Sequence, residues 1–397
     1  MADPIFSFSR NPSTKVNVKV IASGLVVANN SLVIIGNIGA TAGTAALGVA
    51  INIDNYGDPV AAAAECVLKF GASSQIQEQV VAAISGVLYS DIQNPTFPPL
   101  VVVPMASAST SAALVTLLPT LLTIQAPYIT CAFKGTDAVA EAALQSYVQA
   151  ISAQDRGRLG QFGSFGFMAL DEDTSTATAV GLNAASSSMS FPWLRDLAAT
   201  KANAPHKVAA AYSAVCASLG IPYLPLDGVR VGGLVPVVNA LDRHTDGDTG
   251  TAALGLGSGL VPLFCVGSSV TISRSITSLV TVSGIQDVSY FDMQDWQVLY
   301  YLRLNAYSIA MQPRYRIAKN SADKRNALKG ELLEMCLTSQ SLGMLQFVEK
   351  FAGLFTAAVS PTNRSASVYR VPVNVVPGFH NKGIEIDGTT QFDLVTA

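Results

Sequence analysis

Pro98-Pro99-Leu100-Val101-Val102-Val103-Pro104 opens the part of the chain in which strand and helix signals alternate most clearly. Its centre, Leu100–Val103, is a short continuous apolar run of the kind found in strands that are buried on both faces. The elements expected after it are a helix at 109–122 interrupted at Pro119, a strand at 128–133, a helix at 137–153 and a strand at 165–170. Strands that alternate with helices at this spacing predict a parallel sheet with crossover helices.

Further elements are expected on both sides of this segment. They are a strand at 31–35, helices at 59–70 and 75–87, helices at 204–219, 292–311 and 327–355, and a strand at 270–281. Gly343 falls inside the last of these helices; it costs about 1 kcal/mol relative to alanine but is not expected to end the helix. Residues 171–192 are expected to form a short helix and a loop, and residues 221–262 to be loop-rich and exposed.

The domain organisation follows from these elements. At 397 residues the chain is long enough for two or three folding units. We expect a mixed α/β (α+β) fold with an extended N-terminal arm at 1–20, an α/β domain at 21–265 whose parallel-sheet core lies at about 98–220, an α+β domain at 266–366 and a C-terminal β arm at 367–397. The arm contains the alternating run Val16–Val20, which suits a strand with two different faces.

The chain is unusually poor in charge for its size. Only 13% of its residues are Asp, Glu, Lys or Arg, its mean hydropathy is +0.38, and a globular chain averages about 25% charged residues. No ionised side chain lies between Lys19 and Asp54, or between Asp91 and Lys134. A protein surface normally needs charge to stay unassociated. The chain therefore belongs either in a membrane or in an assembly that covers much of its surface.

The details of the sequence argue against membrane insertion. A spanning helix needs about 20 consecutive apolar residues, whereas Val20–Ile53 is interrupted by asparagines, threonines and glycines. Leu100–Val103 and Ala112–Ile124 are each too short, and the start at Met1–Pro4 has no signal-peptide pattern. We expect a soluble, cytosolic polypeptide whose surface is largely buried by copies of itself, with no direct membrane insertion.

Net charge and cysteine content argue against a nucleic-acid-binding protein, a cysteine metal site and a disulfide framework. The net charge of −3 gives no general attraction to nucleic acid, and no nucleic-acid partner is expected. The five cysteines are odd in number and widely separated, which fits neither a metal site nor a disulfide framework. They are expected to be buried free thiols.

A glycine-rich stretch, Gly36-Asn-Ile-Gly39-Ala-Thr-Ala-Gly43, follows the first expected strand. It lacks the Gly-Lys-Ser/Thr ending of a P-loop, and its glycine spacing differs from that of the dinucleotide fingerprint. A turn between two strands is the favoured interpretation. A nucleotide-binding α/β enzyme that uses this loop stays open as an alternative.

Other polar stretches give weak signals for chemistry. Asp242-Arg-His-Thr-Asp246-Gly-Asp248 only loosely resembles a cation-binding loop, because it lacks the spacing and the closing Glu of an EF-hand. Asp171-Glu172-Asp173 would be a catalytic carboxylate cluster only if its loop folded into a cleft; a solvated acidic turn is favoured. We therefore predict no catalytic, cofactor-binding or metal-binding residues.

One cluster of basic residues stands out in this charge-poor chain. Its members, which have only Asp323 as an opposing charge among them, are Arg314, Arg316, Lys319, Lys324, Arg325 and Lys329. Such a concentration indicates either a surface for an acidic partner or a solvated loop between two helices.

Three stretches follow one another in the second half: Val270-Thr-Ile-Ser-Arg274-Ser-Ile276-Thr277, Asp287-Val-Ser-Tyr290-Phe-Asp292 and Leu299-Tyr-Tyr301-Leu-Arg303. Together they resemble the contractile-tail sheath proteins of bacteriophages, most closely the Mu-like group. Matches in the same order extend over roughly residues 25–395 and include Pro98–Pro104, the turn at Gly157–Gln161, the helix at Pro205–Ala217 and the closing Gln391-Phe-Asp-Leu. The family's "D-P-A-R-P-L" stretch survives only faintly at Ile221–Leu226, and the β-rich insertion that many members carry after Pro104 is missing.

The resemblance implies a structural, non-catalytic role without a cofactor. Sheath subunits stack as helical rings, of six subunits each in the family, around a tail tube, and their terminal arms add strands to the sheets of neighbours. It implies that 21–265 lies on the outside and 266–366 on the inside, and that the partners are other copies, the tube protein, and baseplate and terminator proteins. The virion tail, assembled in the host cytoplasm, would be its location. The residues predicted for strand exchange are Val16, Val18, Val20, Val371, Val373, Ile384, Ile386 and Phe392.

The basic cluster is the predicted tube contact, because the C-terminal region faces the tube in the family. Related alternatives are the sheath of an R-type bacteriocin or of a type VI-like machine, which shares the fold. A tail-tube or baseplate protein is a further alternative that would need less α/β bulk.

Overall fold

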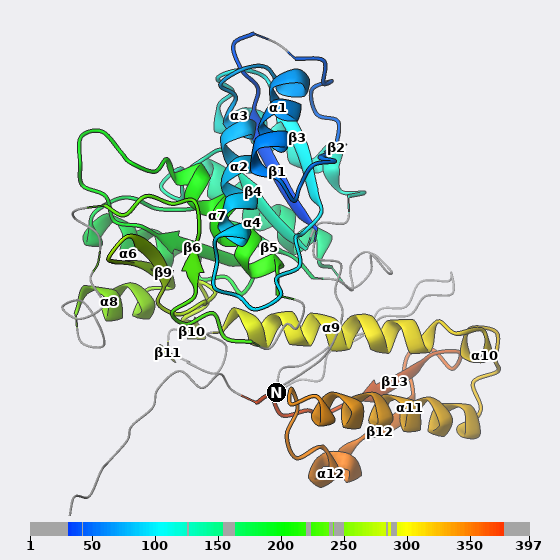
Figure 1. Ribbon diagram of the computed structural model, residues 1–397. Coiled ribbons are helices and arrows are strands. Elements are labelled where there is room, and N and C mark those ends of the chain that lie inside the picture. Colours follow the sequence, from blue (N-terminus) through cyan, green and yellow to red (C-terminus); the bar gives the residue numbers. More distant parts are fainter. Residues whose placement is uncertain are drawn as a thin grey trace, which may run out of the picture.

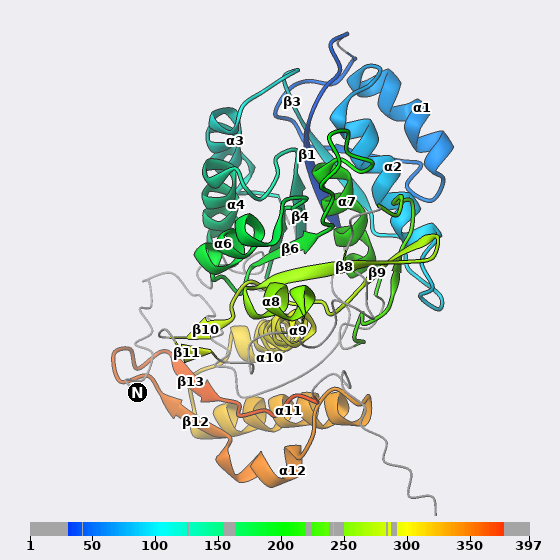
Figure 2. The ribbon, with the colours of Figure 1, turned by 90° about the vertical axis from the view of Figure 1, so that its left-hand side faces the viewer.

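The computed structural model describes residues 31–41, 43–124, 127–153, 163–219, 224–237, 241, 250–282, 285–286 and 292–376. A large α/β body contains most of them, and a smaller body of helices and two strands lies beside it (Figure 1). The helix α9 (Met293–Ala310) runs between the two bodies (Figures 1 and 2). The predicted arm at 1–20 and the residues after 376 lie outside the described residues.

A nine-stranded sheet forms the centre of the large body. Its strands, in spatial order, are β2 (Ile51–Asn52), β3 (Leu100–Met105), β1 (Leu32–Asn37), β4 (Tyr128–Cys131), β5 (Phe165–Phe167), β6 (Met189–Trp193), β8 (Leu260–Val266), β9 (Ser269–Ile272) and β7 (Arg230–Val231). The six strands from β3 to β8 are parallel, and β2, β9 and β7 are antiparallel to their neighbours. The parallel sheet with crossover helices predicted from residues 98–170 is confirmed.

Helices cover both faces of this sheet (Figure 2). One face carries α1 (Pro59–Phe70), α2 (Gln75–Leu88) and α7 (Pro205–Ala217), and the other carries α3 (Ser111–Leu117) with the 3₁₀ turn η1 (Leu118–Leu121), α4 (Ala138–Ile151), α6 (Thr174–Ala184) and α8 (Thr251–Gly257). Successive side chains of a strand point to opposite faces. Leu32 and Ile34 of β1 accordingly join the first helix layer, and Val33 and Ile35 join the second.

Short polar side chains set the starts of several helices. Asp58, Ser74, Asp137 and Asp173 are the N-cap residues of α1, α2, α4 and α6, and each side chain accepts hydrogen bonds from backbone N–H groups of the first turn. Such caps satisfy donors that have no partner within the helix. The starts of these four helices therefore have a local cause in the sequence.

The smaller body lies on the other side of α9. It comprises α10 (Pro313–Arg316), α11 (Ala322–Ser341), α12 (Val348–Phe351), the 3₁₀ turn η4 (Ala352–Leu354) and the antiparallel pair β12 (Thr356–Val359) and β13 (Ser367–Arg370). The single long helix predicted at 327–355 is wrong, because α11 ends at Ser341. Gly343 follows with φ of 80°, a left-handed conformation that reverses the chain after the helix.

Two further findings concern the border between the bodies. The hairpin of β8 and β9 crosses residue 265, where the domain boundary was expected, so the strand at Ser269–Ile272 belongs to the large sheet. A second short pair, β10 (Thr281–Val282) and β11 (Ile285–Gln286), follows it. The division into domains and arms stays a prediction. Within the described ranges, no helix combines the length and the hydropathy that a bilayer crossing requires.

Candidate functional site

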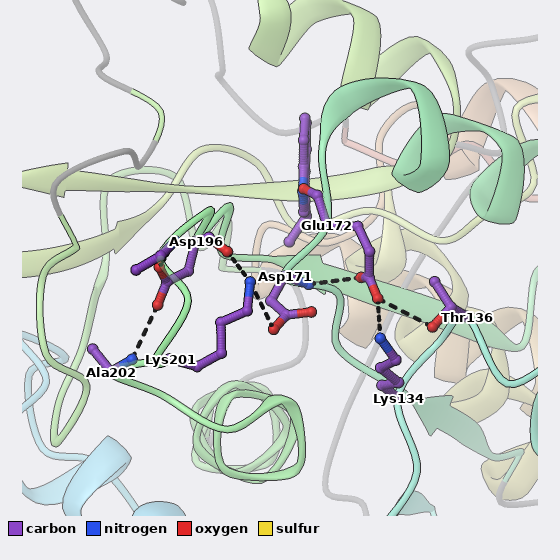
Figure 3. Close-up of polar contacts among 9 residues, drawn as sticks. Lys134, Thr136, Asp171, Glu172, Asp196, Lys201 and Ala202 are labelled. Atoms are coloured by element: carbon purple, nitrogen blue, oxygen red, sulfur yellow. Dashed lines mark hydrogen bonds and ion pairs between the residues drawn. The ribbon is translucent and has the colours of Figure 1, made fainter.

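Ligands of parallel α/β sheets bind beyond the carboxyl ends of the strands, and the acidic triplet Asp171–Asp173 lies there (Figure 3). It directly follows Leu170, which bridges to Trp193 at the end of β6. The Glu172 carboxylate forms an ion pair with Lys134, with 2.5 Å between Nζ and Oε1. The Thr136 hydroxyl donates to the same oxygen at 3.1 Å. The cluster is partly buried rather than a solvated turn.

Every carboxylate of this cluster has partners within the protein. Asp171 lies 3.4 Å from the Lys201 ammonium, and Asp173 caps α6. Asp196 accepts from the backbone N–H groups of Ala198 and Ala202 at 3.0 Å each, and Lys201 also donates to the Asp196 carbonyl. Sequence reasoning missed Lys134, Asp196 and Lys201, because they come from separate loops without a local motif. The cluster holds loops together rather than presenting free acids for chemistry.

The two central carboxyls have opposite pKa shifts. Burial raises the pKa of Glu172, but hydrogen bonds from Lys134, the Asp171 N–H and Thr136 outweigh it, so this pKa lies below its ordinary value. Burial and the neighbouring Glu172 charge raise the pKa of Asp171. Glu172 therefore adds stability that is present above its unfolded-state pKa of about 4.3 and is lost as pH falls through its lower folded value. Asp171 contributes stability at low pH, which is lost as pH rises through its raised folded-state pKa.

Replacement of Glu172 by Gln is expected to destabilise the fold in a pH-dependent manner. The variant keeps the size of the side chain but loses the charge-assisted bonds to Lys134 and Thr136, so the free energy of unfolding should fall by about 1–2 kcal/mol at pH 7. The difference from the wild type should shrink at acidic pH, because Glu172 becomes protonated as the pH falls through its lowered folded-state pKa. Urea unfolding at neutral and at acidic pH measures it. Asp173→Asn, which keeps a capping side chain, is the control; an equal loss at both pH values would contradict the assignment.

The glycines of the 36–43 loop approach the backbone of their own chain. A Cβ on Gly39 would lie 2.3 Å from the carbonyl oxygen of Ala72, and a Cβ on Gly43 would lie 2.2 Å from that of Lys69. The loop leads to β2, and no helix begins at its end. In a phosphate loop, by contrast, glycines leave room for the ligand and open a helix. The geometry therefore favours a packed connection between two strands.

Gly39→Ala is expected to lower the free energy of unfolding by about 2–3 kcal/mol, because the new methyl group would overpack the Ala72 backbone. Thermal or urea unfolding measures the loss. Gly57→Ala is the matched control, since a Cβ there meets no atom within 4 Å, and its effect should stay within about 0.5 kcal/mol. A stable Gly39→Ala protein would reopen the nucleotide-loop interpretation.

The predicted basic cluster lies at one end of the smaller body, on α10 and the first turns of α11 (Figure 1). Arg316, Lys319 and Lys324 are exposed. Arg314 forms an ion pair with Glu331, with 2.7 Å between Nη2 and Oε2, and Arg325 donates to Asn320. Cations near a helix N-terminus are unfavourable for the helix dipole. The helix dipole therefore does not favour the positive charge of Lys324 and Arg325, although Arg325 has a partner in Asn320. The role of the cluster in partner binding stays a prediction.

The residues predicted for strand exchange fall into two groups. Val371 and Val373 pack within the subunit: Val373 is buried in the core of the smaller body with Leu302 and Phe355, and Val371 packs against it. Residues 344–346 hold this segment through backbone bonds to 374–376. The others, Val16, Val18, Val20, Ile384, Ile386 and Phe392, lie outside the described residues.

The two-stranded sheet of β12 and β13 has open edges. Thr356–Val359 pairs with Ser367–Arg370, and within the described part of the chain neither strand pairs with a third. Both strands are exposed or half-buried along their length. A two-stranded sheet without further strands gains little stability of its own. The outer edge of such a strand can pair with a further strand.

The Asp242–Asp248 stretch also lies outside the described residues. Among the residues that are described, His, Cys, Asp and Glu form no group of three or more that could hold a metal ion. Four of the five cysteines are buried, Cys265 is half-buried, and all five are free thiols.

Comparisons with solved structures find the same fold over nearly the whole chain. A chain in the six-fold symmetrised cryo-EM structure of the anti-feeding prophage baseplate matches with a TM-score of 0.61 at 11% identity, covering 96% of this chain and 100% of that chain. A sheath tail protein from Desulfitobacterium hafniense matches with a TM-score of 0.59 at 10% identity, covering 91% of this chain and 100% of that one. A sheath tail protein from Listeria innocua matches with a TM-score of 0.61 at 11% identity, covering 91% and 94% respectively.

No protein-family model and no curated protein matches the sequence. The structural likenesses show that the chain has the fold of sheath tail proteins. The fold implied by the sequence resemblance is confirmed, including its mixed α/β character.

Proposed function

We propose that this protein is the structural subunit of a contractile tail sheath. It would assemble as helical rings around a tail tube, and contraction would rearrange the subunits into a lower-energy packing that drives the tube through the host envelope. No nucleotide or other cofactor enters this proposal. The observation that carries it is the end-to-end likeness of the fold to two sheath tail proteins, which spans 91% of the chain in each case.

The open hairpin supports a specific way of joining subunits. Strands from neighbouring copies would add to the free edges of β12 and β13, so that four strands replace a marginal pair. The donors would be the N-terminal run with Val16, Val18 and Val20 and the C-terminal residues with Ile384, Ile386 and Phe392. Strand addition relies on main-chain hydrogen bonds, so such links tolerate rotation of the bodies that they connect. Val371 and Val373 would hold the C-terminal arm to its own subunit before it crosses over.

The basic cluster at 314–329 would be the contact with the tube. Electrostatic contacts at an exposed surface favour fast association and are weakened by salt, which suits a joint that must release during contraction. Further partners would be baseplate and terminator proteins, with rings of six subunits by resemblance. The protein would be located in a virion tail assembled in the host cytoplasm.

The same fold serves more than one kind of contractile machine, and the match to the anti-feeding prophage baseplate has the same TM-score as the match to the Listeria innocua sheath protein. The sheath of a related machine, such as an R-type bacteriocin or a type VI-like system, is therefore the alternative within this proposal. The genes that neighbour the coding sequence would separate the two.

Negative-stain electron microscopy of the protein expressed alone tests the proposal directly. Long, striated hollow tubes are the expected result, because the low charge leaves a surface suited to self-association. A sheath that needs a template would instead form tubes only when a tail tube is added. Dispersed monomers or small closed oligomers under both conditions would contradict the proposal and return attention to the enzyme alternative.

A further inference from the structure

The N-terminal end of α9 is fixed to the large body by a partly buried ion pair. Arg274, just after β9, donates from Nε and Nη2 to the two carboxylate oxygens of Asp292, each at 2.8 Å. Asp292 is the N-cap residue of α9 and is buried. The Met293 N–H also donates to the Ser275 carbonyl at 3.2 Å. Two parallel bonds between planar groups fix orientation as well as distance.

A second arginine fixes the same helix further along. Arg303 is only 7% exposed, and its Nη2 donates to the Ser152 carbonyl at 2.6 Å. Ser152 is the C-cap residue of α4, where the helix dipole favours a positive charge. The two arginine contacts are separated by eleven positions on α9, about 16 Å along its axis.

Close packing fills the stretch between these contacts. The Gln297 amide donates to the Tyr128 hydroxyl at 2.8 Å, and the Tyr300 ring packs edge-on against Phe165 with 5.6 Å between centroids. A Cβ on Gly163 would lie 2.1 Å from the Tyr300 ring, so the side chain of Tyr300 occupies space that only a glycine leaves open. Tyr128 and Phe165 are the first residues of β4 and β5. This part of α9 therefore lies across the amino-terminal ends of the central strands.

The remainder of α9 extends to the smaller body (Figures 1 and 2). Leu302 of α9 belongs to the core of the smaller body. The position of the smaller body therefore depends on the direction of α9. A contact at the start of a helix fixes one point of its axis, and the packing of Gln297 and Tyr300 fixes the middle of α9. The contact of Arg303 holds the helix beyond that packing and so limits how far its remaining part can swing. We propose that Arg274 and Arg303 are positioning residues that lock α9 to the large body, so that the two bodies move as one unit.

This inference concerns the isolated subunit and does not depend on the proposed sheath function. Both arginines stand in the sequence stretches at 270–277 and 299–303 that carry the family resemblance. Their contacts lie within the subunit, which gives those stretches a physical role: they set the angle between the bodies. Under the proposed function, this fixed connection would make the tube-facing body move together with the outer body.

Pulsed electron–electron double resonance, on protein kept below the concentration at which it assembles, tests the lock. Genetically encoded spin labels would replace Val139 on α4 and Glu334 on α11, both of which are exposed. The wild-type protein is expected to give one narrow distance distribution. The double variant Arg274→Met and Arg303→Met should give a distribution about twofold wider, because the helix then moves about a hinge near residue 292.

Controls separate positioning from general stability. Arg316→Met removes an exposed arginine and should leave the distribution unchanged, and Arg303→Lys should stay narrow because it keeps a charged donor for the Ser152 carbonyl. Hydrogen exchange of β1 and β4 in the double variant should match the wild type. An unchanged distance width in the double variant would overturn the inference. Loss of protection in β1 and β4 together with α9 would also overturn it, since the arginines would then act on the whole fold.

Discussion

A subunit that lacks residues 1–18 is expected to fold and to remain soluble but to form no long tubes. The described body begins at Ser31, and its three apolar cores are formed by residues from Leu32 onward. We therefore expect these cores to form without the deleted segment. In the proposed assembly it supplies a strand to a neighbour's β12–β13 sheet, and each missing strand breaks a link in the lattice. The expected effect on tube length is close to all-or-none.

Sedimentation velocity measures whether the truncated subunit stays soluble, and negative-stain microscopy measures whether it forms long tubes. A matched pair of point variants isolates the main-chain contribution. Val18→Pro removes a backbone N–H and should reproduce the deletion, whereas Val18→Thr keeps a β-branched side chain and should still form tubes. Tubes of normal length from the truncated protein would remove the N-terminal arm from the proposal. An insoluble truncated protein would contradict the claim that the body folds without it.

The elements that could be predicted from the sequence have local signals. Leu100–Val103 is a continuous apolar run and forms β3 within residues 100–105. The helix expected at 292–311 appears as Met293–Ala310, and the one expected at 204–219 appears as Pro205–Ala217. Hydrophobic periodicity acts within a few residues, so such elements can be predicted without knowledge of the fold.

The order of the strands depends on contacts between distant segments. β1 lies between β3 and β4, although it precedes both in the chain, and nothing in its own residues states which strands flank it. β6 and β8 lie at the edges of two segments that were expected to be a short helix with a loop (171–192) and a loop-rich stretch (221–262). Each strand also contains a proline, Pro192 in β6 and Pro262 in β8. Proline lacks a backbone donor and usually argues against an inner strand. Here both prolines are tolerated within paired strands.

The candidate functional residues, too, could be predicted from the sequence only where their signal is local. The basic cluster was visible because six cations stand within sixteen positions of a charge-poor chain. Arg303 was visible only as part of a familiar stretch, since its partner Ser152 is 151 positions away. The burial of Val373 in the small core likewise depends on Leu302 and Phe355, which approach it from other elements. The roles of residues such as Arg303 and Val373 depend on tertiary neighbours and can be assigned only once the fold is known.

Charge reversal of Arg314, Arg316 and Lys319 to Glu is expected to slow assembly on a tail tube by about tenfold or more, because electrostatic attraction controls the association of exposed charged surfaces. Self-assembly without a tube should change far less. Arg314 and Arg316 are on α10, which lies beyond the end of α9 that points away from the large body (Figure 1). None of the three residues belongs to the core of the smaller body. The effect should shrink as salt rises, since screening acts on the same attraction.

A matched control separates the effect of the basic cluster itself from the effect of a changed net charge. Arg316→Glu and Arg230→Glu alter net charge equally, and both residues are exposed, but Arg230 lies on the edge strand β7 of the large body. Arg316→Glu is the cleaner single change, because Arg314 is paired with Glu331 and its reversal would also place two acids together. Light scattering with and without added tubes measures both rates. Equal slowing by the two single variants, or equal slowing of templated and untemplated assembly, would mean that the basic cluster is not the tube contact. Selective slowing by Arg316→Glu would place the acidic partner surface on the tube.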